Sequence, residues 1–322
     1  MELKQTDRKL LGFLYHSNRE PLTKIAKATG LSREQVDYRI NKYVEEGIIR
    51  KFFTIFNYSR LGYPYFAMLL LKFNKYNNLN NFKESLGKNN HCISYGNILG
   101  KYDMYMNLVF KNEKEMNEYL AELINKDLSD YLLIKPYFAE LYPLKFLKDK
   151  KEEKSFLFAD YSGEEVKLEK TEVEILKLLN EDGRSRIIDI ANKLNISNEL
   201  VIYKLKKLYS NGIILGNRIQ FDMEKLGYFY SGILLQMNNM KKENVEKLKR
   251  FARQHPFVNS FSLSVAKPNC FMQFFHRTEE ELRRGIEELK ETMKDENMEF
   301  NIIFISDDEE RANGLPFLKE NV

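Results

Sequence analysis

Near the start of the chain, apolar side chains recur at the spacing of short helices. The pattern predicts a helix after Thr6, a short helix over residues 23–29, and a third helix after Ser32. The apolar positions are Leu10, Leu11, Phe13 and Leu14 in the first helix, Ile25 and Ala26 in the second, and Val36, Ile40 and Val44 in the third. Gly30 suits the left-handed residue that ends the second helix. After Gly47 a β-branched run begins, which predicts a strand pair.

This pattern returns with a constant offset of 165 residues. The register holds without a gap from Thr6 to Tyr63 against Thr171 to Tyr228. Matched pieces are Ile25-Ala26 with Ile190-Ala191, Leu31-Ser32 with Ile196-Ser197, Gly47-Ile48-Ile49 with Gly212-Ile213-Ile214, and Leu61-Gly62-Tyr63 with Leu226-Gly227-Tyr228. In the second copy Asn195 stands where the first has Gly30. Solenoid repeats have periods of roughly 20–50 residues, so this repeat indicates two copies of a larger unit.

The remainder of each copy reads as alternating strands and helices. The first copy has strands over 65–73, 92–98, 102–110 and 132–141, and helices over 79–86 and 114–128. The second has strands over 230–237, 258–265, 271–276 and 299–306, and helices over 244–254 and 279–293. This βαββαβ order predicts a four-stranded antiparallel sheet with two helices on one face. The bare face needs a cover, and the other copy can supply it within the chain.

Together these elements predict an α+β fold. Three helices followed by a strand pair, with a tight turn before the third helix, form the plan of a winged helix-turn-helix domain. The chain is expected to hold two winged helix-turn-helix domains alternating with two ferredoxin-like βαββαβ domains. The expected boundaries are 1–62 and 63–147 for the first copy, 148–165 for a linker, 166–227 and 228–308 for the second copy, and 309–322 for a tail.

The third helix of such a domain is free to enter the major groove of DNA, so its outward residues are candidate DNA contacts. Arg can pair with guanine or phosphate, Gln with adenine, and Tyr can contact sugar or methyl groups. The candidates in the first copy are Ser32, Arg33, Gln35, Tyr38, Arg39 and Lys42, with Arg50 and Lys51 in the wing. Those in the second copy are Asn198, Tyr203, Lys204 and Lys206, with Arg218 in the wing. The expected partner is double-stranded DNA.

Charge, cysteine content and apolar stretches add a few limits on the possible partners and location of the protein. The net charge is +4, with the larger basic excess in residues 1–60, so neither copy carries a strong field for polyanions. Cys92 and Cys270 occupy different positions in the two copies and are expected to be reduced, buried thiols, with no metal pattern. The N-terminus lacks the apolar core of a signal peptide, and the longest apolar stretch falls far short of the ~20 residues that span a bilayer. We expect a cytoplasmic protein without a membrane partner.

Taken together, the motifs resemble the Lrp/AsnC, or feast/famine, family of transcription regulators twice over. The matching residues are Gly30-Leu31-Ser32, Val36, Arg39-Ile40, Gly47-Ile48-Ile49 and Leu61-Gly62-Tyr63 in the first copy, and Asp182-Gly183-Arg184-Ser185, Ile190-Ala191, Gly212-Ile213-Ile214 and Phe221-Asp222 through Lys225-Tyr228 in the second. The resemblance implies a ligand-sensing, RAM-like βαββαβ domain that also dimerises. It further implies an amino-acid-like effector at the family's Gly-x-Tyr-Asp turn, here Gly100, Tyr102 and Asp103.

The second copy departs from this pattern. It has Ala266-Lys267-Pro268-Asn269 in place of the Gly-x-Tyr-Asp turn, and Lys204 where the family has Arg. The favoured hypothesis is a sequence-specific DNA-binding regulator whose copies form an intrachain pseudo-dimer, with a homodimer or higher oligomer through the βαββαβ sheets. No catalytic residue, metal or cofactor is expected.

Two other functions remain open. One is a protein-interaction module of the transcription machinery that has lost DNA binding. The other is an enzyme similar to the sirohaem decarboxylases, paired relatives that use His and Arg near the sheet. Such a site needs proton donors in one cleft. The four histidines, His16, His91, His255 and His276, lie at non-equivalent positions and form no cluster in the sequence.

Overall fold

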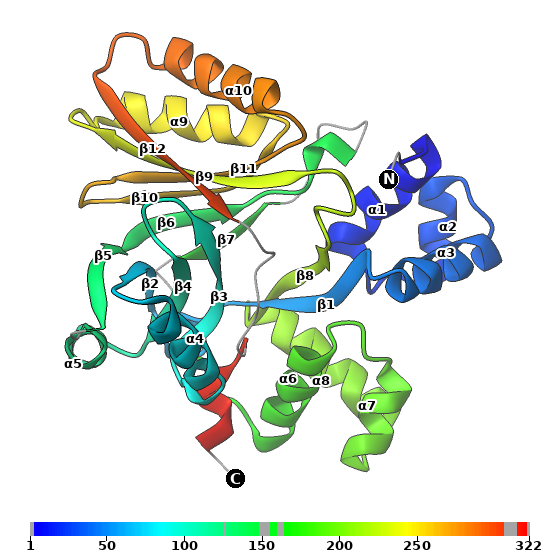
Figure 1. The fold of residues 1–322 in the computed structure, drawn as a ribbon. Helices are drawn as coiled ribbons and strands as arrows, with labels where there is room; N and C mark the ends of the chain where they lie inside the picture. The colour runs from blue at the N-terminus through cyan, green and yellow to red at the C-terminus, as the bar shows by residue number, and fades with distance from the viewer. Residues whose placement is uncertain (1–2, 125–126, 148–154, 160–163, 306–313, 321–322) are drawn as a thin grey trace. The chain divides into compact units, whose positions relative to one another are not determined.

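The computed structural model describes residues 3–124, 127–147, 155–159, 164–305 and 314–320. The chain forms two compact units (Figure 1). The winged-helix unit comprises residues 1–57, 142–156 and 166–228, and the sheet unit comprises residues 58–141, 157–165 and 229–322. Each unit therefore contains one part of both copies of the repeat.

The winged-helix unit contains two equivalent heads. The first head consists of α1 (Gln5–Ser17), α2 (Leu22–Thr29), α3 (Arg33–Glu45) and β1 (Ile49–Phe56), and the second of α6 (Lys170–Glu181), α7 (Ile187–Leu194), α8 (Asn198–Ser210) and β8 (Ile214–Phe221). Gly30 and Asn195 end the second helix of each head with φ of 72° and 53°, which confirms both left-handed caps. In α3, Val36 and Ile40 are buried as predicted, but Val44 is exposed and Tyr43 is buried instead.

The wing differs from its prediction. A strand pair was expected inside each copy, but each head has one strand, and β1 pairs antiparallel with β8 of the other head. Each strand packs on the first helix of the opposite head. The ring of Tyr15 on α1 stacks on Phe221 of β8 at 5.9 Å, and Thr54 Oγ1 of β1 donates to the Leu179 carbonyl of α6. Because each strand completes the core of the other head, the two heads form one body.

The sheet unit contains the two βαββαβ motifs. The first has β2 (Tyr65–Phe73), α4 (Tyr76–Ser85), β3 (Cys92–Leu99), β4 (Met104–Phe110), α5 (Glu113–Leu123) and β5 (Leu128–Ile134). The second has β9 (Phe229–Met237), α9 (Lys242–Gln254), β10 (Val258–Ser264), β11 (Cys270–His276), α10 (Glu279–Thr292) and β12 (Met298–Ile305). The short elements are η1 (Leu86–Lys88), β6 (Pro136–Leu141), η2 (Lys145–Leu147), β7 (Phe156–Ala159) and η3 (Pro316–Glu320). The strand order is β5-β2-β4-β3-β12-β9-β11-β10-β6-β7.

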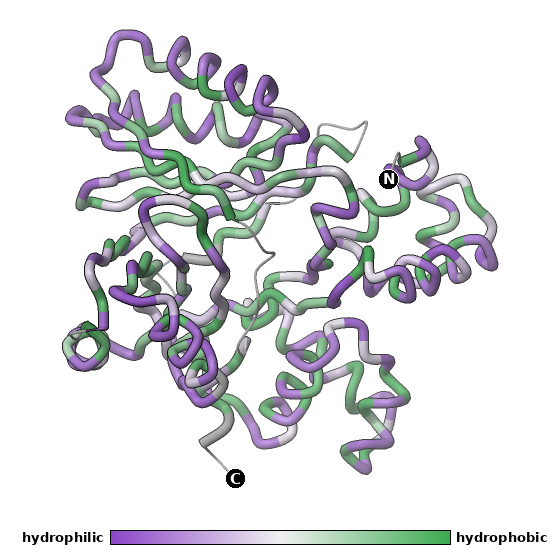
Figure 2. Tube along the Cα trace, in the orientation of Figure 1, coloured by the Kyte–Doolittle hydropathy of each residue, from purple (hydrophilic) through white to green (hydrophobic). Residues whose placement is uncertain are grey.

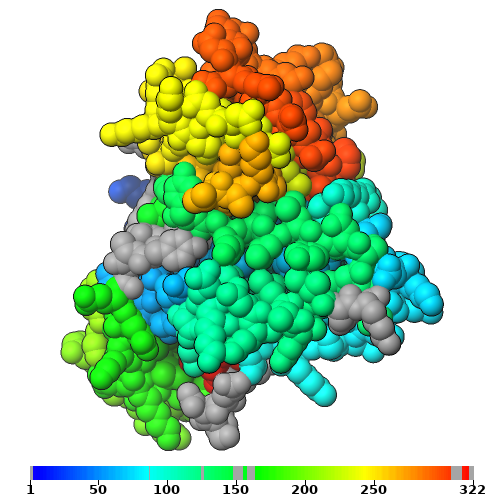
Figure 3. Space-filling view, turned by 90° about the vertical axis from the view of Figure 1, so that its left-hand side faces the viewer, coloured from blue at the N-terminus to red at the C-terminus, as the bar shows by residue number. Residues whose placement is uncertain are grey.

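The two motifs exchange the ends of their last strands. The single strand predicted over 132–141 is instead β5, which stays in the first motif, and β6, which pairs with β10 of the second. In return, the end of β12 pairs with β3 of the first motif. The two exchanged pairings occupy corresponding positions in the two motifs. Pro136 of β6 lies opposite Ser264 of β10, and Ile305 of β12 lies opposite Ile98 of β3. In Figure 3 the green surface of the β5–β6 segment meets the yellow and orange surface of the second motif.

The helix-free faces of the two motifs pack against each other. Their shared core contains Leu70, Ile98, Tyr102, Tyr105 and Ile134 from the first motif, and Leu234, Phe271, Ile303 and Ile305 from the second. This confirms that the second copy covers the bare face of the first, and Figure 2 shows the apolar strands beneath helices with polar outer surfaces. Both helix-free faces are thus buried within one chain, and the expected homodimer or higher oligomer through the βαββαβ sheets stays a prediction.

Several remaining expectations concern small features. Cys92 and Cys270 are free and buried, as predicted, and burial raises the pKa of the Cys270 thiol. The linker expected over 148–165 and the tail over 309–322 lie mostly outside the described residues, as do the acidic residues 307–310. Among the described residues, no helix has the length and apolar character needed to cross a membrane.

Candidate nucleic-acid interface

Serine caps position the third helix of each head. Ser32 Oγ accepts a hydrogen bond from the Gln35 amide, and the Gln35 side chain accepts one from the Ser32 amide, which completes a capping box. In the second head Ser197 Oγ accepts from the amide of Leu200, whose side chain cannot return the bond. Ser32 Oγ and the Gln35 carbonyl oxygen therefore hold the start of the helix, and both side chains stay exposed.

Two residue types face outward at the same place in both heads. Tyr38 is 67% exposed and the equivalent Tyr203 is 60% exposed, which is unusual for a large aromatic side chain. Glu34 and Glu199 lie in the first turn of their helices, where a hydrogen bond from the residue's own amide and another from the capping serine lower the pKa of each carboxyl. A carboxylate here can accept a hydrogen bond from the amino group of cytosine.

Arg39 of the first head points inward. Its guanidinium pairs with Asp7 of α1, which also accepts a hydrogen bond from the Tyr43 hydroxyl. Asp7 is 5% exposed, and desolvation together with the bond to Asp7 raises the pKa of Tyr43. Arg39 therefore holds the third helix on the first helix, and its side chain stays 31% exposed.

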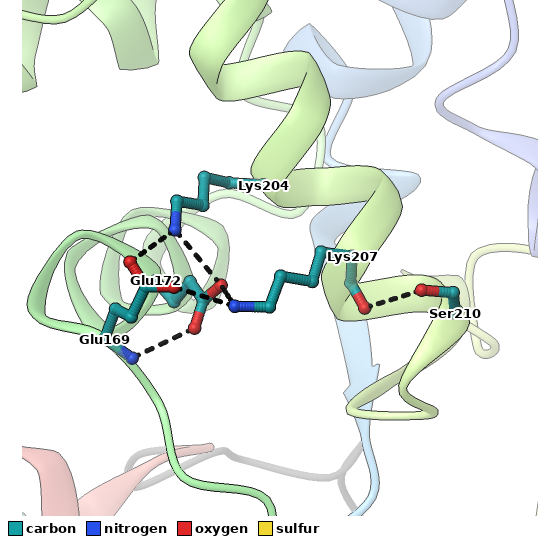
Figure 4. Close-up of polar contacts among 5 residues, drawn as sticks. All are labelled: Glu169, Glu172, Lys204, Lys207 and Ser210. Carbon is teal, nitrogen blue, oxygen red and sulfur yellow. Dashed lines mark hydrogen bonds and ion pairs between the residues drawn. The ribbon is translucent and has the colours of Figure 1, made fainter.

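Lys204 of the second head also holds the third helix on the first helix, through two glutamates (Figure 4). Lys204 Nζ lies 2.6 Å from Glu169 Oε2 and 3.4 Å from Glu172 Oε1, and Lys207 Nζ lies 2.8 Å from both carboxylates. The bonds from Lys204 and Lys207 lower the pKa of Glu169 to about 2. At equivalent positions an Asp–Arg pair is thus replaced by a Glu–Lys pair. Lys204 thus holds α8 on α6 in the way that Arg39 holds α3 on α1.

The candidates in the wing are also engaged. Arg50 Nη2 lies 2.8 Å from Asp222 Oδ2 across the β1–β8 ribbon. Lys51 Nζ lies 5.7 Å and the Arg218 guanidinium 5.9 Å from the centre of the Phe53 ring. Lys51 and Arg218 thus lie over the same aromatic ring, and Arg50 faces a carboxylate.

The outward-facing candidates of the two third helices come from both heads. They are Arg33, Tyr38 and Lys42 of the first head, and Asn198, Tyr203 and Lys206 of the second; all six are exposed. Glu34 and Glu199, which helical spacing also places off the core stripe, lie on the same outward faces. These two positions keep the same residue in both copies, while most of their exposed neighbours differ.

The candidate effector turn lies in the sheet unit, between β3 and β4. Gly100 has φ of 130°, and Tyr102 is buried in the core between the two motifs. The Asp103 carboxylate accepts hydrogen bonds from Lys72 Nζ at 2.9 Å and from the Phe73 amide at 2.8 Å. In the second motif the carboxamide of Asn269 takes the equivalent place, accepting from the Met237 amide and donating to its carbonyl. In both motifs, a side chain of the turn therefore bonds to the backbone at the end of the first strand.

Replacing Asp103 by Asn is expected to be well tolerated. Because Asn269 makes the same backbone bond in the second motif, Asp103→Asn should lower the free energy of unfolding by no more than about 1 kcal/mol, the scale of one exposed ion pair. Asp103→Ala, which also loses the bond from the Phe73 amide, should cost about 1–2 kcal/mol more. Urea denaturation measures both, and equal losses for the two variants would show that the backbone bond is unimportant.

The four histidines occupy separate places. His91 lies beside the Val109 carbonyl and the Phe110 ring, His255 beside Glu288, His276 between Ser231 and Thr278, and His16 against the Phe156 ring. Desolvation lowers the pKa of His276. Within the described part of the chain, no group of three His, Cys, Asp or Glu residues is arranged to hold a metal ion.

Known proteins match both heads. The winged helix-turn-helix DNA-binding family matches residues 3–50 and 168–214. The HTH-type transcriptional regulator FL11 of Pyrococcus abyssi is 33% identical over 120 residues, covering 37% of this chain and 79% of that regulator. FL11 of Pyrococcus horikoshii is 32% identical over 118 residues, covering 37% and 78%.

Among solved structures, the siroheme decarboxylase NirDL is similar in fold. It covers 98% of this chain and 96% of its own, with a TM-score of 0.60 and 15% sequence identity. That likeness concerns the fold of the tandem arrangement. The sequence similarity, in contrast, is to transcriptional regulators. The chain belongs to the Lrp/AsnC family of HTH-type transcriptional regulators.

Proposed function

We propose that this chain is a sequence-specific DNA-binding transcription regulator that reads two half-sites with the two heads of a single molecule. The observation that carries this proposal is the β1–β8 ribbon, which joins the heads so that each chain presents two reading helices, α3 and α8. Regulators of the helix-turn-helix type bind two half-sites through a symmetric pair of such helices. Because these heads are not identical, the operator is proposed to be an asymmetric pair of half-sites.

The proposed contacts divide into two classes. Arg33 and Lys42 in the first head and Lys206 in the second supply cations for phosphates or base edges, with Lys51 and Arg218 in the wing. Glu34, Tyr38, Asn198, Glu199 and Tyr203 supply the polar and aromatic groups that discriminate bases. The modest net charge of +4 fits a protein whose affinity depends on a few placed contacts.

The test is a titration of fluorescent genomic fragments at two salt concentrations. The full-length protein is compared with Arg33→Ala/Tyr38→Ala/Lys42→Ala and with a control, Lys114→Ala/Lys242→Ala/Lys294→Ala, which removes exposed cations of the sheet unit. Wild-type and control affinities should be similar and should fall steeply with salt, whereas the first variant should bind at least about 100-fold more weakly, from three lost contacts.

Three outcomes separate the candidate functions. Salt-sensitive binding that only the first variant loses supports the regulator, and the enriched fragments give its site. Equal weakening of both variants would indicate non-specific attraction. If the folded protein fails to bind at low salt, the regulator proposal is overturned, and a protein partner or a tetrapyrrole ligand, detected by its absorption band, becomes the next candidate.

We also propose an amino-acid-like effector for the first motif, at the turn formed by Gly100, Tyr102 and Asp103. The closed geometry of this turn means that a ligand would have to displace Lys72 from the Asp103 carboxylate. Association with a second chain would have to use surfaces other than the helix-free faces, such as the edge strand β5. Analytical ultracentrifugation with and without candidate amino acids tests both points.

A further inference from the structure

The outward faces of the two reading helices share a centre and differ on their flanks. At about 100° per residue, Glu199, Tyr203 and Lys206 lie along the outward line of α8, and Leu200 and Ile202 fall on either side of it. The first head repeats the Glu and Tyr but has Gln35 and Asp37 on the flanks. The heads therefore differ most in polarity at the two flanking positions.

The side chain of Leu200 breaks two local rules. It is 37% exposed, and it replaces the Gln that closes the capping box in the first head. Ile202 is also 37% exposed, where the first head has a carboxylate. A sequence that gives up the second bond of a capping box for a partly exposed apolar side chain is expected to do so at a functional site.

We propose that the second head reads the C5-methyl groups of thymine through Leu200 and Ile202. This inference rests on the proposed function, since it concerns the same reading helix. Thymine is the base that presents a methyl group in the major groove, and apolar side chains recognise it by contact. Glu and Tyr, shared by both heads, then read common positions, and the second half-site carries thymines at the positions beside them.

The surroundings of these side chains favour DNA over a protein as the occupant. Leu200 and Ile202 are separated by Tyr203 and Glu199, so they do not form the continuous apolar patch that marks a protein-binding face. Lys206 is exposed on the same face, and Lys193 and Asn198 are exposed nearby in the sequence. Cationic and polar groups around two isolated apolar side chains match a groove lined by phosphates and methyl groups.

The test uses an operator selected from random duplexes with the full-length protein. Thymine is replaced by deoxyuridine, which lacks only the methyl group, in one half-site at a time. Dissociation constants are measured by fluorescence anisotropy for the wild type, for Leu200→Gln/Ile202→Asn, and for Val44→Asn, a control that changes an exposed apolar residue of α3. Thermal unfolding of each protein is recorded alongside.

In the second half-site, wild type and Val44→Asn should lose about fourfold in affinity for each contacted methyl removed, the value of one buried methyl group. Leu200→Gln/Ile202→Asn should still bind DNA but should no longer distinguish thymine from deoxyuridine. Because Leu200→Gln restores the capping box, the melting temperature should not fall. Selective binding without any effect of deoxyuridine overturns this inference alone, whereas absence of DNA binding overturns the proposed function. If deoxyuridine weakened binding equally in the two half-sites, the reading of thymine by the second head would also be contradicted.

Discussion

Replacement of Glu172 by alanine is expected to lower the free energy of unfolding by about 3 kcal/mol. The side chains of Glu172 and Lys204 are 2% and 8% exposed, so the variant would leave a buried ammonium without its nearest buried carboxylate. Breaking a buried ion pair from one side costs about 3–5 kcal/mol, and the remaining contact with Glu169 places the expected loss at the lower end. Denaturation in urea at neutral pH measures it.

The control is the double variant Glu172→Leu/Lys204→Met, which replaces both charges by apolar side chains. Because no charge is left unpaired, its stability should lie within about 1 kcal/mol of the wild type.

The dependence of stability on pH provides a second check. Burial alone would raise the pKa of Glu172, but bonds with the Glu169 amide, Lys207 and Lys204 lower it below 4.5. The pair therefore stabilises the fold fully above the ordinary pKa of a glutamate, and this contribution should be lost as the pH falls through the lowered pKa of Glu172. A loss under 1 kcal/mol for Glu172→Ala would contradict this role.

Insertion of five base pairs between the two half-sites is expected to weaken binding by at least about 100-fold. The two heads share one antiparallel ribbon, so their reading helices cannot move apart to follow half-sites rotated by half a helical turn. Only one head would then bind, and the gain from two linked sites, about 10²–10⁴, would be lost. Electrophoretic mobility shifts with the selected operator measure the change.

A five-base-pair insertion outside the operator serves as the control and should have no effect. An insertion of ten base pairs restores the facing of the half-sites but increases their separation, and a rigid ribbon should tolerate it poorly as well. Full affinity for the five-base-pair insertion would mean that the heads act as independent modules, contrary to the pairing of β1 with β8.

Sequence reasoning was most successful where the determinants are local. Helix ends at Gly30 and Asn195 follow from the conformations that these residues tolerate, and the burial of the bare sheet faces follows from their apolar alternation. Pairing of β1 with β8 and the departure of β6 from its own motif were not predicted. A strand's hydrogen-bonding edge accepts any partner in register, so its choice depends on contacts distant in the sequence.

The same limit applied to the candidate DNA contacts. Arg39, Gln35 and Lys204 stand at positions that helical spacing places off the core stripe, but each is engaged within its own head. Composition alone cannot tell a cation that faces solvent from one that faces a carboxylate. The repeat contained a usable signal, because Asp7 and Arg39 change together into Glu172 and Lys204 165 residues later.

The exchange of strand ends in the sheet unit has a consequence for how such a protein behaves in a cell. Two separate subunits meet at a rate set by their concentration, and they come apart on dilution. Here Pro136 opposite Ser264 and Ile305 opposite Ile98 join two halves of one polypeptide. The pairing of the two halves is therefore the same at any expression level and survives dilution. Mutations in one half are inherited together with the other half, which leaves the two heads free to specialise.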